Sequence, residues 1–167
     1  MPAILRKIDH KVYWAEDGDF TTYVPAGEAP ADALQDLRTT ENRLSIWRLE
    51  EDRTNLDRVL AAIVSGRDNL QKCDFIILDF RHIEENDLEM EANPGDTADS
   101  DANSKWHFNL THLSSASLAR LANVMFAHGE RHRRLERELI PLLRQSVTDG
   151  YIAEGALKPN IAARINK

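Results

Sequence analysis

The stretch from Leu44 to Phe80, LSIWRLEEDRTNLDRVLAAIVSGRDNLQKCDFIILDF, decides the fold of this 167-residue chain. Leu44–Leu49 is typical of a strand, and Cys73–Phe80 carries a four-residue apolar run that is typical of a strand buried on both faces. Between them, apolar residues recur at helical spacing from Leu56 to Val64, and Gly66 follows, where we expect a left-handed helix cap. This order of strand, helix and strand predicts a βαβ unit with a right-handed crossover.

Shorter strand signals come before this unit. From Leu5 to Val24 we expect two or three short antiparallel strands, because the first apolar residues share one parity: Ile4, Ile8, Val12 and Trp14. Phe20–Val24 is rich in strand-forming residues and ends at a proline. Pro30 suits the first position of a helix, so we predict a short helix from Pro30 to Leu37.

The chain that follows Phe80 is predicted to be irregular before order returns. A short helix near Glu84–Met90 fits the pattern. Ala92 to Ser104 is rich in Pro, Gly, Asp, Ser, Asn and Thr and has few groups that could pack, so we expect a mobile loop there. The alternation from Trp106 to Leu110 then predicts a strand.

The C-terminal part of the chain is predicted to be helical. Ser114 or Ser115 can cap a long helical region, in which Gly129 indicates a break and Pro141 a kink or a restart. One further short helix is predicted from Pro159 through Ile165.

Together these patterns predict an α/β fold, with α+β as the alternative. It has short N-terminal antiparallel strands, one central βαβ unit and a long C-terminal helical region packed on the sheet. We expect residues 1–113 to form the sheet domain, with an acidic mobile loop at residues 84–104. Residues 114–167 would be a helical region of the same domain or a small helical appendage.

The composition excludes several kinds of site. Cys73 is the only cysteine, so an internal disulfide and a zinc site made of several cysteines are excluded. No apolar run approaches the roughly 20 residues of a membrane span, so we expect no membrane partner. A reducing, cytoplasmic compartment is the simplest interpretation. The scattered glycines fit neither a dinucleotide fingerprint nor a phosphate-binding loop.

The net charge of −7 comes from one segment of the chain. Between residues 83 and 104 there are eight acids and no Lys or Arg: Glu84, Glu85, Asp87, Glu89, Glu91, Asp96, Asp99 and Asp101. Without these eight, the chain has 20 acids and 21 bases. Such a concentration of charge can steer the protein towards a basic partner. A solvated charged surface without a partner is the alternative.

A catalytic or metal site is conceivable after the buried strand. Asp79 ends that strand, and His82, Glu84 and Glu85 follow within six residues. Ligands of open α/β sheets bind at the carboxyl ends of strands, and carboxylates with an imidazole could hold Mg²⁺ or Mn²⁺ and activate water. In the alternative, which we favour, Asp79 caps the next turn, His82 is a surface residue and the glutamates begin a solvated run.

Four further histidines are candidates with weaker patterns. His107 and His112 flank a strand-to-helix junction and could serve as general acid or base, although a solvent-facing His107 is the simpler interpretation. His128 and His132 have the i, i+4 spacing of a zinc-binding helix, but Gly129 replaces the glutamate of that motif. We favour a helix break at Gly129 over a buried histidine seam, in which the two imidazoles would need partners.

The densest basic cluster runs from Arg131 to Arg137 and is interleaved with glutamates. It could contact phosphate, and nucleic acid is a third, weaker partner. A solvated helix face with Glu–Arg pairs is the alternative that we favour. Arg131 and Arg134 are therefore retained as partner-binding candidates, together with the eight acids.

Two functional hypotheses follow. The first is a small cytoplasmic interaction protein without a cofactor: a subunit, an adaptor or an inhibitor of the immunity or bacterial defence type. It would act through its helical face and acidic loop on another protein or on a second copy of itself. The second is a metal-dependent hydrolase of a phosphoester, nuclease-like, that uses Asp79, His82, Glu84 and Glu85 with Mg²⁺ or Mn²⁺.

Overall fold

One six-stranded sheet forms the centre of the protein in a computed structural model that describes residues 2–16 and 24–166. The strand order is β4-β5-β2-β1-β3-β6, and neighbouring strands are antiparallel throughout. The strands are β1 (Ala3–Ile8), β2 (Leu44–Leu49), β3 (Lys72–Asp79), β4 (Met90–Ala92), β5 (His107–Leu110) and β6 (Glu130–Leu135). The predicted combination of sheet and helices is therefore confirmed.

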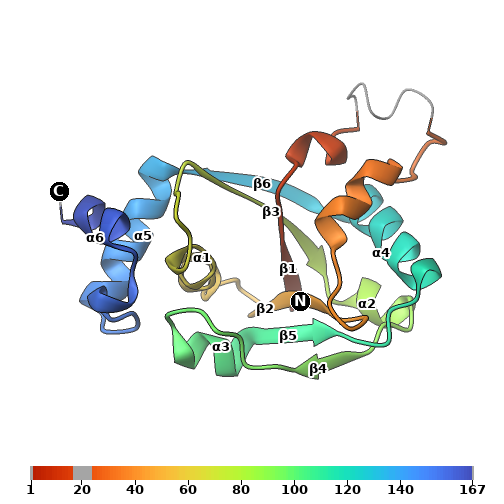
Figure 1. Ribbon diagram of the computed structural model, residues 1–167. Coiled ribbons are helices and arrows are strands. Elements are labelled where there is room, and N and C mark those ends of the chain that lie inside the picture. Colours follow the sequence, from red (N-terminus) through yellow and green to blue (C-terminus); the bar gives the residue numbers. More distant parts are fainter. Residues whose placement is uncertain (1, 17–23, 167) are drawn as a thin grey trace.

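Helices cover both faces of this sheet (Figure 1). The α-helices are α1 (Leu56–Ser65), α2 (Arg81–Glu85), α3 (Ser100–Trp106), α4 (Ser115–His128), α5 (Glu136–Thr148) and α6 (Pro159–Ile165). Short 3-10 helices are η1 (Lys11–Trp14), η3 (Ala31–Leu37) and η4 (Glu154–Ala156). In the part of the chain that the structure describes, no helix combines the length and apolarity needed to cross a membrane.

The predicted unit of β2, α1 and β3 is present, but its two strands are not neighbours. β1 lies between them, so that Leu5 is the Cα partner of Trp47 on one side and of Ile77 on the other. Because β1 is antiparallel to both, β2 and β3 run parallel to each other. The unit is thus a split βαβ arrangement, with the N-terminal strand inserted into it.

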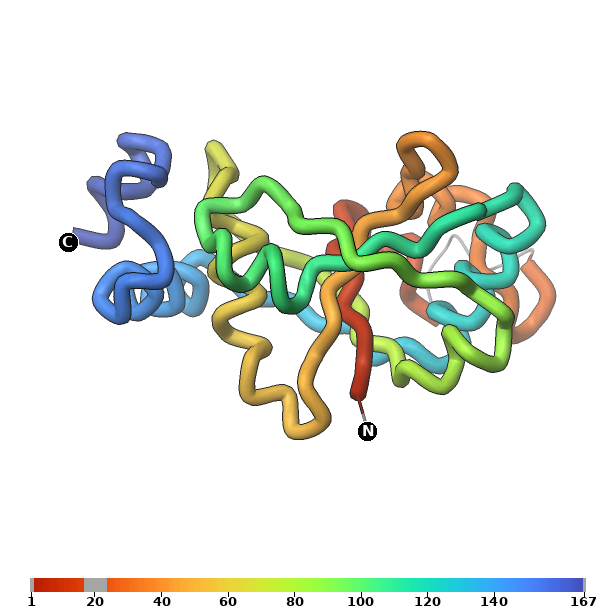
Figure 2. Tube along the Cα trace, turned by 90° about the horizontal axis from the view of Figure 1, so that it is seen from below, coloured from red at the N-terminus to blue at the C-terminus, as the bar shows by residue number. Residues whose placement is uncertain are grey.

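The sheet separates two hydrophobic cores, because successive side chains of a strand point to opposite faces. Leu5 of β1 packs in the core under α1, α5 and α6, whereas Ile4 and Ile8 pack in the core under α4 and η3. Figure 2 shows these two groups of helices from below, with the strands between them. β3 contributes to both cores, which explains its continuous apolar run.

Within residues 2–16, the N-terminal segment forms one strand, β1, and then a short 3-10 helix. β1 is a strand, but Val12 and Trp14 belong to η1. The reason is tertiary: the buried indole of Trp14 donates to the carboxylate of Asp36 (2.9 Å), which also accepts from the backbone amide of His10 (3.2 Å). Of the predicted strand Phe20–Val24, residues 20–23 lie outside the described residues. The short helix predicted after Pro30 is confirmed as η3.

The acidic segment contains more regular structure than the expected loop. α2 and β4 occupy its first half, and α3 begins within the stretch predicted to be mobile. Asp99 caps α3 by accepting a hydrogen bond from the backbone amide of Ala102 (2.9 Å), and its carboxylate is also bound by Arg58 of α1. Contacts with α1 therefore organise residues whose composition alone favours disorder.

The C-terminal region is also less helical than predicted. Ser114 caps α4 as expected, and the helix ends at Gly129, so the predicted break is confirmed. A strand that the sequence analysis did not predict, β6, follows and pairs with β3 from Ile77↔Glu130 to Lys72↔Leu135. α5 then continues as one helix through Pro141. The predicted helix at Pro159–Ile165 is confirmed as α6.

Candidate functional site

The residues at the end of β3 border a pocket of about 550 Å³, here called the histidine pocket. Asp79 ends β3, and α2 follows directly and places His82 on the pocket wall. His128, the last residue of α4, lines the same pocket because Gly129 ends the helix there. The pocket thus joins the end of a central strand to the ends of two helices.

The two imidazoles of this pocket are stacked. The ring centroids of His82 and His128 are 4.6 Å apart, and the ring planes are 10° from parallel. His82 is largely buried, and its Nδ1 lies 3.1 Å from Oε2 of Glu85.

The carboxylates of the histidine pocket already have partners. Asp79 accepts a hydrogen bond from the backbone amide of Arg81 (3.1 Å), as the capping interpretation predicts. Glu130 accepts two hydrogen bonds from the guanidinium of Arg53 (2.9 and 2.5 Å). The hydrogen bond from Arg53 outweighs burial and lowers the pKa of Glu130. Hydrogen bonds from the chain itself therefore hold the carboxylates of Asp79 and Glu130 in place.

The proposed metal-binding residues are only partly brought together. Asp79 and His82 line the histidine pocket, whereas Glu84 and Glu85 do not, and both are exposed. Among the described residues, no three His, Cys, Asp or Glu side chains are placed to hold one metal ion.

The other candidate histidines lie apart. His107 of β5 lines a second pocket, and its Nε2 lies 2.6 Å from the hydroxyl of Ser45. His112 is exposed in the turn after β5 and pairs with Glu89 (2.8 Å). His132 lies in β6, where its ring stacks on Phe75 at 5.2 Å. His128 and His132 therefore do not share a helix face.

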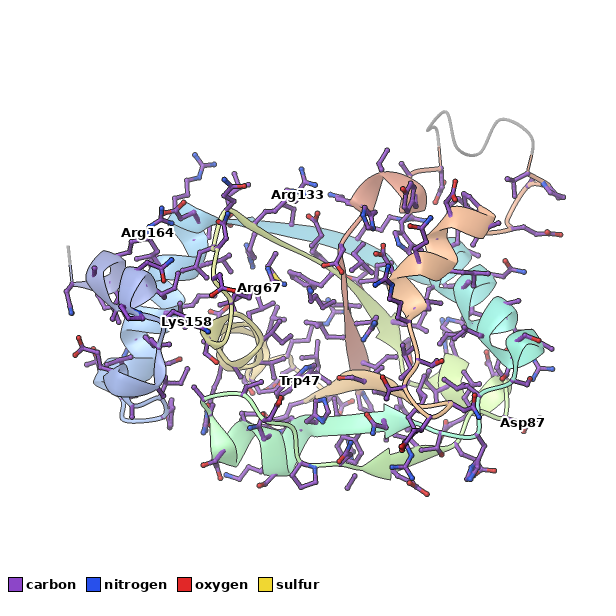
Figure 3. All side chains as sticks on the ribbon, viewed as in Figure 1. Trp47, Arg67, Asp87, Arg133, Lys158 and Arg164 are labelled. Carbon is purple, nitrogen blue, oxygen red and sulfur yellow. The ribbon has the colours of Figure 1, made fainter. Side chains whose placement is uncertain are left out.

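Five of the eight acids are exposed and lie within eight consecutive residues, here called the acidic strip: Glu84, Glu85, Asp87, Glu89 and Glu91. It runs from α2 to β4, and Asp87 lies at the turn between them (Figure 3). Within the described residues, no Lys or Arg forms an ion pair with any of the five. Their only ionic partners there are the imidazoles of His82 and His112.

The other three acids have different surroundings. Asp99 is fully buried and accepts two hydrogen bonds from Arg58 (2.7 and 2.9 Å). Asp101 pairs with Arg58 and with Lys105. Asp96 is exposed and lines the second pocket. The acidic segment therefore divides into a neutralised part at α3 and an unneutralised strip at α2 and β4.

The basic cluster is largely neutralised by the chain itself. Arg131 pairs with Glu16 and also donates to the backbone carbonyl of Phe126. Arg133 pairs with Asp74 and Arg134 with Glu138. The predicted Glu–Arg pairing is present, although residues 130–135 form an edge strand rather than a helix.

Several polar residues of the second pocket were not predicted as site residues from the sequence, namely Ser45, Asn109, Arg38 and Arg43. Ser45 and Asn109 sit in strands as single polar residues between apolar ones. A polar residue at a core-facing strand position was the signal that could have revealed them.

Comparison with family models, with curated proteins and with solved structures found no match to this chain.

Proposed function

We propose that this protein is a cytoplasmic interaction protein, a subunit, adaptor or immunity-type inhibitor that docks a basic protein surface on its acidic strip. The supporting observation is the exposed strip of five carboxylates that no Lys or Arg of the described residues neutralises. Several other acids of the chain are paired with arginines, as Asp99 is with Arg58 and Asp74 with Arg133. A basic partner would supply the missing counter-charges and gain speed of association from them.

The position of the strip supports the same proposal. β4 is one of the two edge strands of the sheet and, among the described residues, pairs only with β5, so a further strand could pair with its outer backbone groups. Edge strands also carry charges that prevent unwanted association. These two roles predict opposite effects of removing the charges, and the experiment below separates them.

The helices offer less apolar surface for a partner than we expected from the sequence. α5 buries Leu139 and Leu143 against α1, and α4 buries Leu121 and Met125 in the core on the other face. Their apolar sides therefore stabilise the protein itself. The proposal rests on the acidic strip for this reason.

The test compares two variants that each remove three negative charges. One neutralises the strip with Glu84→Gln, Asp87→Asn and Glu89→Gln, and the control neutralises exposed acids elsewhere with Glu28→Gln, Asp32→Asn and Asp57→Asn. Each protein, tagged, is used for affinity capture from the native host at low and high salt, followed by mass spectrometry. Asn at position 87 keeps the local backbone, because Asn tolerates the positive φ of 51° there.

We expect the wild type and the control to capture the same basic protein at low salt, and the strip variant to lose it. Capture that is equal for all three proteins, or no specific capture, would contradict the proposal. Self-association of the strip variant in light scattering would instead indicate that the acids prevent β4 from pairing with a second copy of the protein.

A metal-dependent hydrolase is the second candidate, favoured by the position of Asp79 and His82 on one pocket wall. Thermal unfolding with Mg²⁺, Mn²⁺ or Zn²⁺ tests it directly. A rise in Tm that Asp79→Asn removes would support a metal site there, and unchanged Tm values would argue against it.

A further inference from the structure

The second pocket, of about 560 Å³, lies on the opposite part of the sheet from the histidine pocket, at the N-terminal end of β2. Its floor is the sheet face that carries Ser45 and Trp47 of β2 and His107 and Asn109 of β5. Loop residues 93–97 form one wall, and residues 38–43 contribute to the other. Trp47, labelled in Figure 3, lies between this sheet face and α1.

The side chains of Ser45 and His107 are hydrogen-bonded to each other on this floor. Nδ1 of His107 contacts the backbone carbonyl of Asn93, which can only accept, so this nitrogen carries a proton. In the neutral ring Nε2 is then the acceptor, and the Ser45 hydroxyl, 2.6 Å away, donates to it. The backbone of Gly95 packs on the same ring, where a Cβ would come within 3.2 Å of the imidazole. The floor is therefore preorganised before any ligand arrives.

Asn109 provides the observation that points to a ligand. It is the Cα partner of Ser45 across the strands, and only 7% of its surface is exposed. Its side-chain amide forms no hydrogen bond within the described residues, although it lines the pocket. Buried amides normally have partners, because a lost hydrogen bond costs about 1–3 kcal/mol. Since the Ser45 hydroxyl contacts His107, the Asn109 NH₂ group is a donor of the floor that has no partner among the described residues.

The rim of the pocket is cationic. Four cations and two carboxylates line it: Arg6, Lys7, Arg38, Arg43, Glu41 and Asp96. Arg38 and Arg43 are exposed, and neither side chain has an ionic or hydrogen-bond partner in the described part of the chain. The side chain of Arg6 donates to two backbone carbonyls, those of Ser45 and Asp36, and Lys7 pairs with Asp9 (2.8 Å).

Burial lowers the pKa of Arg6 to about 10, against the opposing effect of Asp36, so this guanidinium is charged at neutral pH. Its Nε atom is buried without a hydrogen-bond partner among the described residues. An anion in the pocket would therefore be attracted by the fixed charge of Arg6 and by the guanidinium groups of Arg38 and Arg43 at the rim.

We propose that this pocket binds a small molecule through an oxyanion group, a carboxylate or a phosphate, held by the Asn109 amide and by Arg38 and Arg43. The volume suits a metabolite-sized ligand rather than a polymer. Trp47 and Ile63 offer apolar contacts to the rest of such a molecule. The inference is independent of the acidic strip, which contributes no residue to the pocket lining.

The experiment is an NMR titration of the labelled full chain with inorganic phosphate and, separately, with succinate, at constant ionic strength set by sodium chloride. Wild type is compared with Arg38→Gln, Arg43→Gln and Asn109→Ala. Arg48→Gln is the matched control, because Arg48 is an exposed arginine of β2 that does not line the pocket. The two probes distinguish phosphate from carboxylate ligands.

We expect saturable shifts at the Asn109 side-chain amide and at His107 with at least one probe. Each arginine variant should weaken binding about tenfold, and Arg48→Gln should leave it unchanged. Shifts that do not saturate, that lie outside the pocket, or that weaken equally in Arg48→Gln would overturn the proposal. Arg38→Gln and Arg43→Gln should still capture the protein partner. A titration without binding would therefore overturn the pocket proposal and leave the proposed function to its own test.

Discussion

Arg58 of α1 binds the buried carboxylate of Asp99 through two parallel hydrogen bonds, Nε to Oδ2 at 2.7 Å and Nη2 to Oδ1 at 2.9 Å. The guanidinium is only 16% exposed and also lies over the ring of Tyr151, 3.6 Å from its centroid. One arginine therefore ties the acidic segment to the central helix and to the C-terminal region. The first prediction concerns this pair.

Arg58→Ala should lower the free energy of unfolding by about 3–5 kcal/mol, because it leaves the Asp99 charge buried without a partner. Asp101→Asn is the control, since Asp101 is half-exposed and its loss should cost at most about 1 kcal/mol. Urea unfolding measures both values, and limited proteolysis of Arg58→Ala should cut within residues 93–106. Equal stability of the two variants would contradict this role of Arg58.

The stability of the protein should depend on Asp74 in a pH-dependent way. Burial raises the pKa of Asp74, but the hydrogen bond and charge of Arg133, with help from Lys72, outweigh it and lower the pKa below its ordinary value. The stabilisation is thus complete above about pH 4 and is lost as the pH falls through the depressed value.

Asp74→Asn should therefore destabilise the protein by about 1–2 kcal/mol at pH 7, and this difference should shrink as the pH falls below about 4. Urea unfolding at a series of pH values measures it. Asp68→Asn, which changes an almost fully exposed carboxylate, should show no comparable loss. A difference that stays constant with pH would refute the role of the Asp74 charge.

Gly129→Ala should destabilise the junction of α4 and β6. A Cβ at this position would collide with the side chain of Ile76 and with the backbone carbonyl of Met125. We expect a loss of about 1–3 kcal/mol, as for other overpacked sites. Gly66→Ala is the matched control, because a Cβ there meets nothing within 4 Å and φ is −90°. The control should be neutral or slightly more stable, and a similar loss in both variants would be unexpected.

Cys73 should resist alkylation in the native protein. Burial raises the pKa of its thiol despite the nearby guanidinium of Arg67, so little thiolate is present and access is blocked. Mass spectrometry after iodoacetamide treatment should show labelling that follows the unfolded fraction across a urea series. Rapid labelling without urea would show that β3 opens readily, and Cys73→Ser provides the unlabelled baseline.

Much of the local structure could be predicted because it depends on neighbouring residues. The apolar spacing from Leu56 to Val64 predicted α1, and the run in Cys73–Phe80 predicted β3. Ser114 and Gly129 marked the two ends of α4. The expectation of a left-handed cap at Gly66 was wrong, because φ there is −90°.

β6 could not be predicted from its own residues. The sequence ERHRRL has no apolar alternation, because this edge strand is held by backbone pairing with β3 and by acids from elsewhere in the chain. Asp74 and Glu16, which bind Arg133 and Arg131, lie 59 and 115 residues away in sequence. The two pockets also depend on contacts between distant parts of the chain. The stack of His82 on His128 and the contact of Ser45 with His107 join residues from different elements.

By itself, the sequence determined α1, β3 and the two ends of α4, and that negative charge is concentrated in one segment, because periodicity, caps and composition act over a few residues. Only the tertiary structure decided that β1 enters between β2 and β3, and that Arg58 pairs with two of the eight acids, Asp99 and Asp101. It also decided which polar side chains meet in a pocket. The physical reason is that strand pairing and burial of charge depend on partners distant in the chain, whose energies appear only when the two cores form.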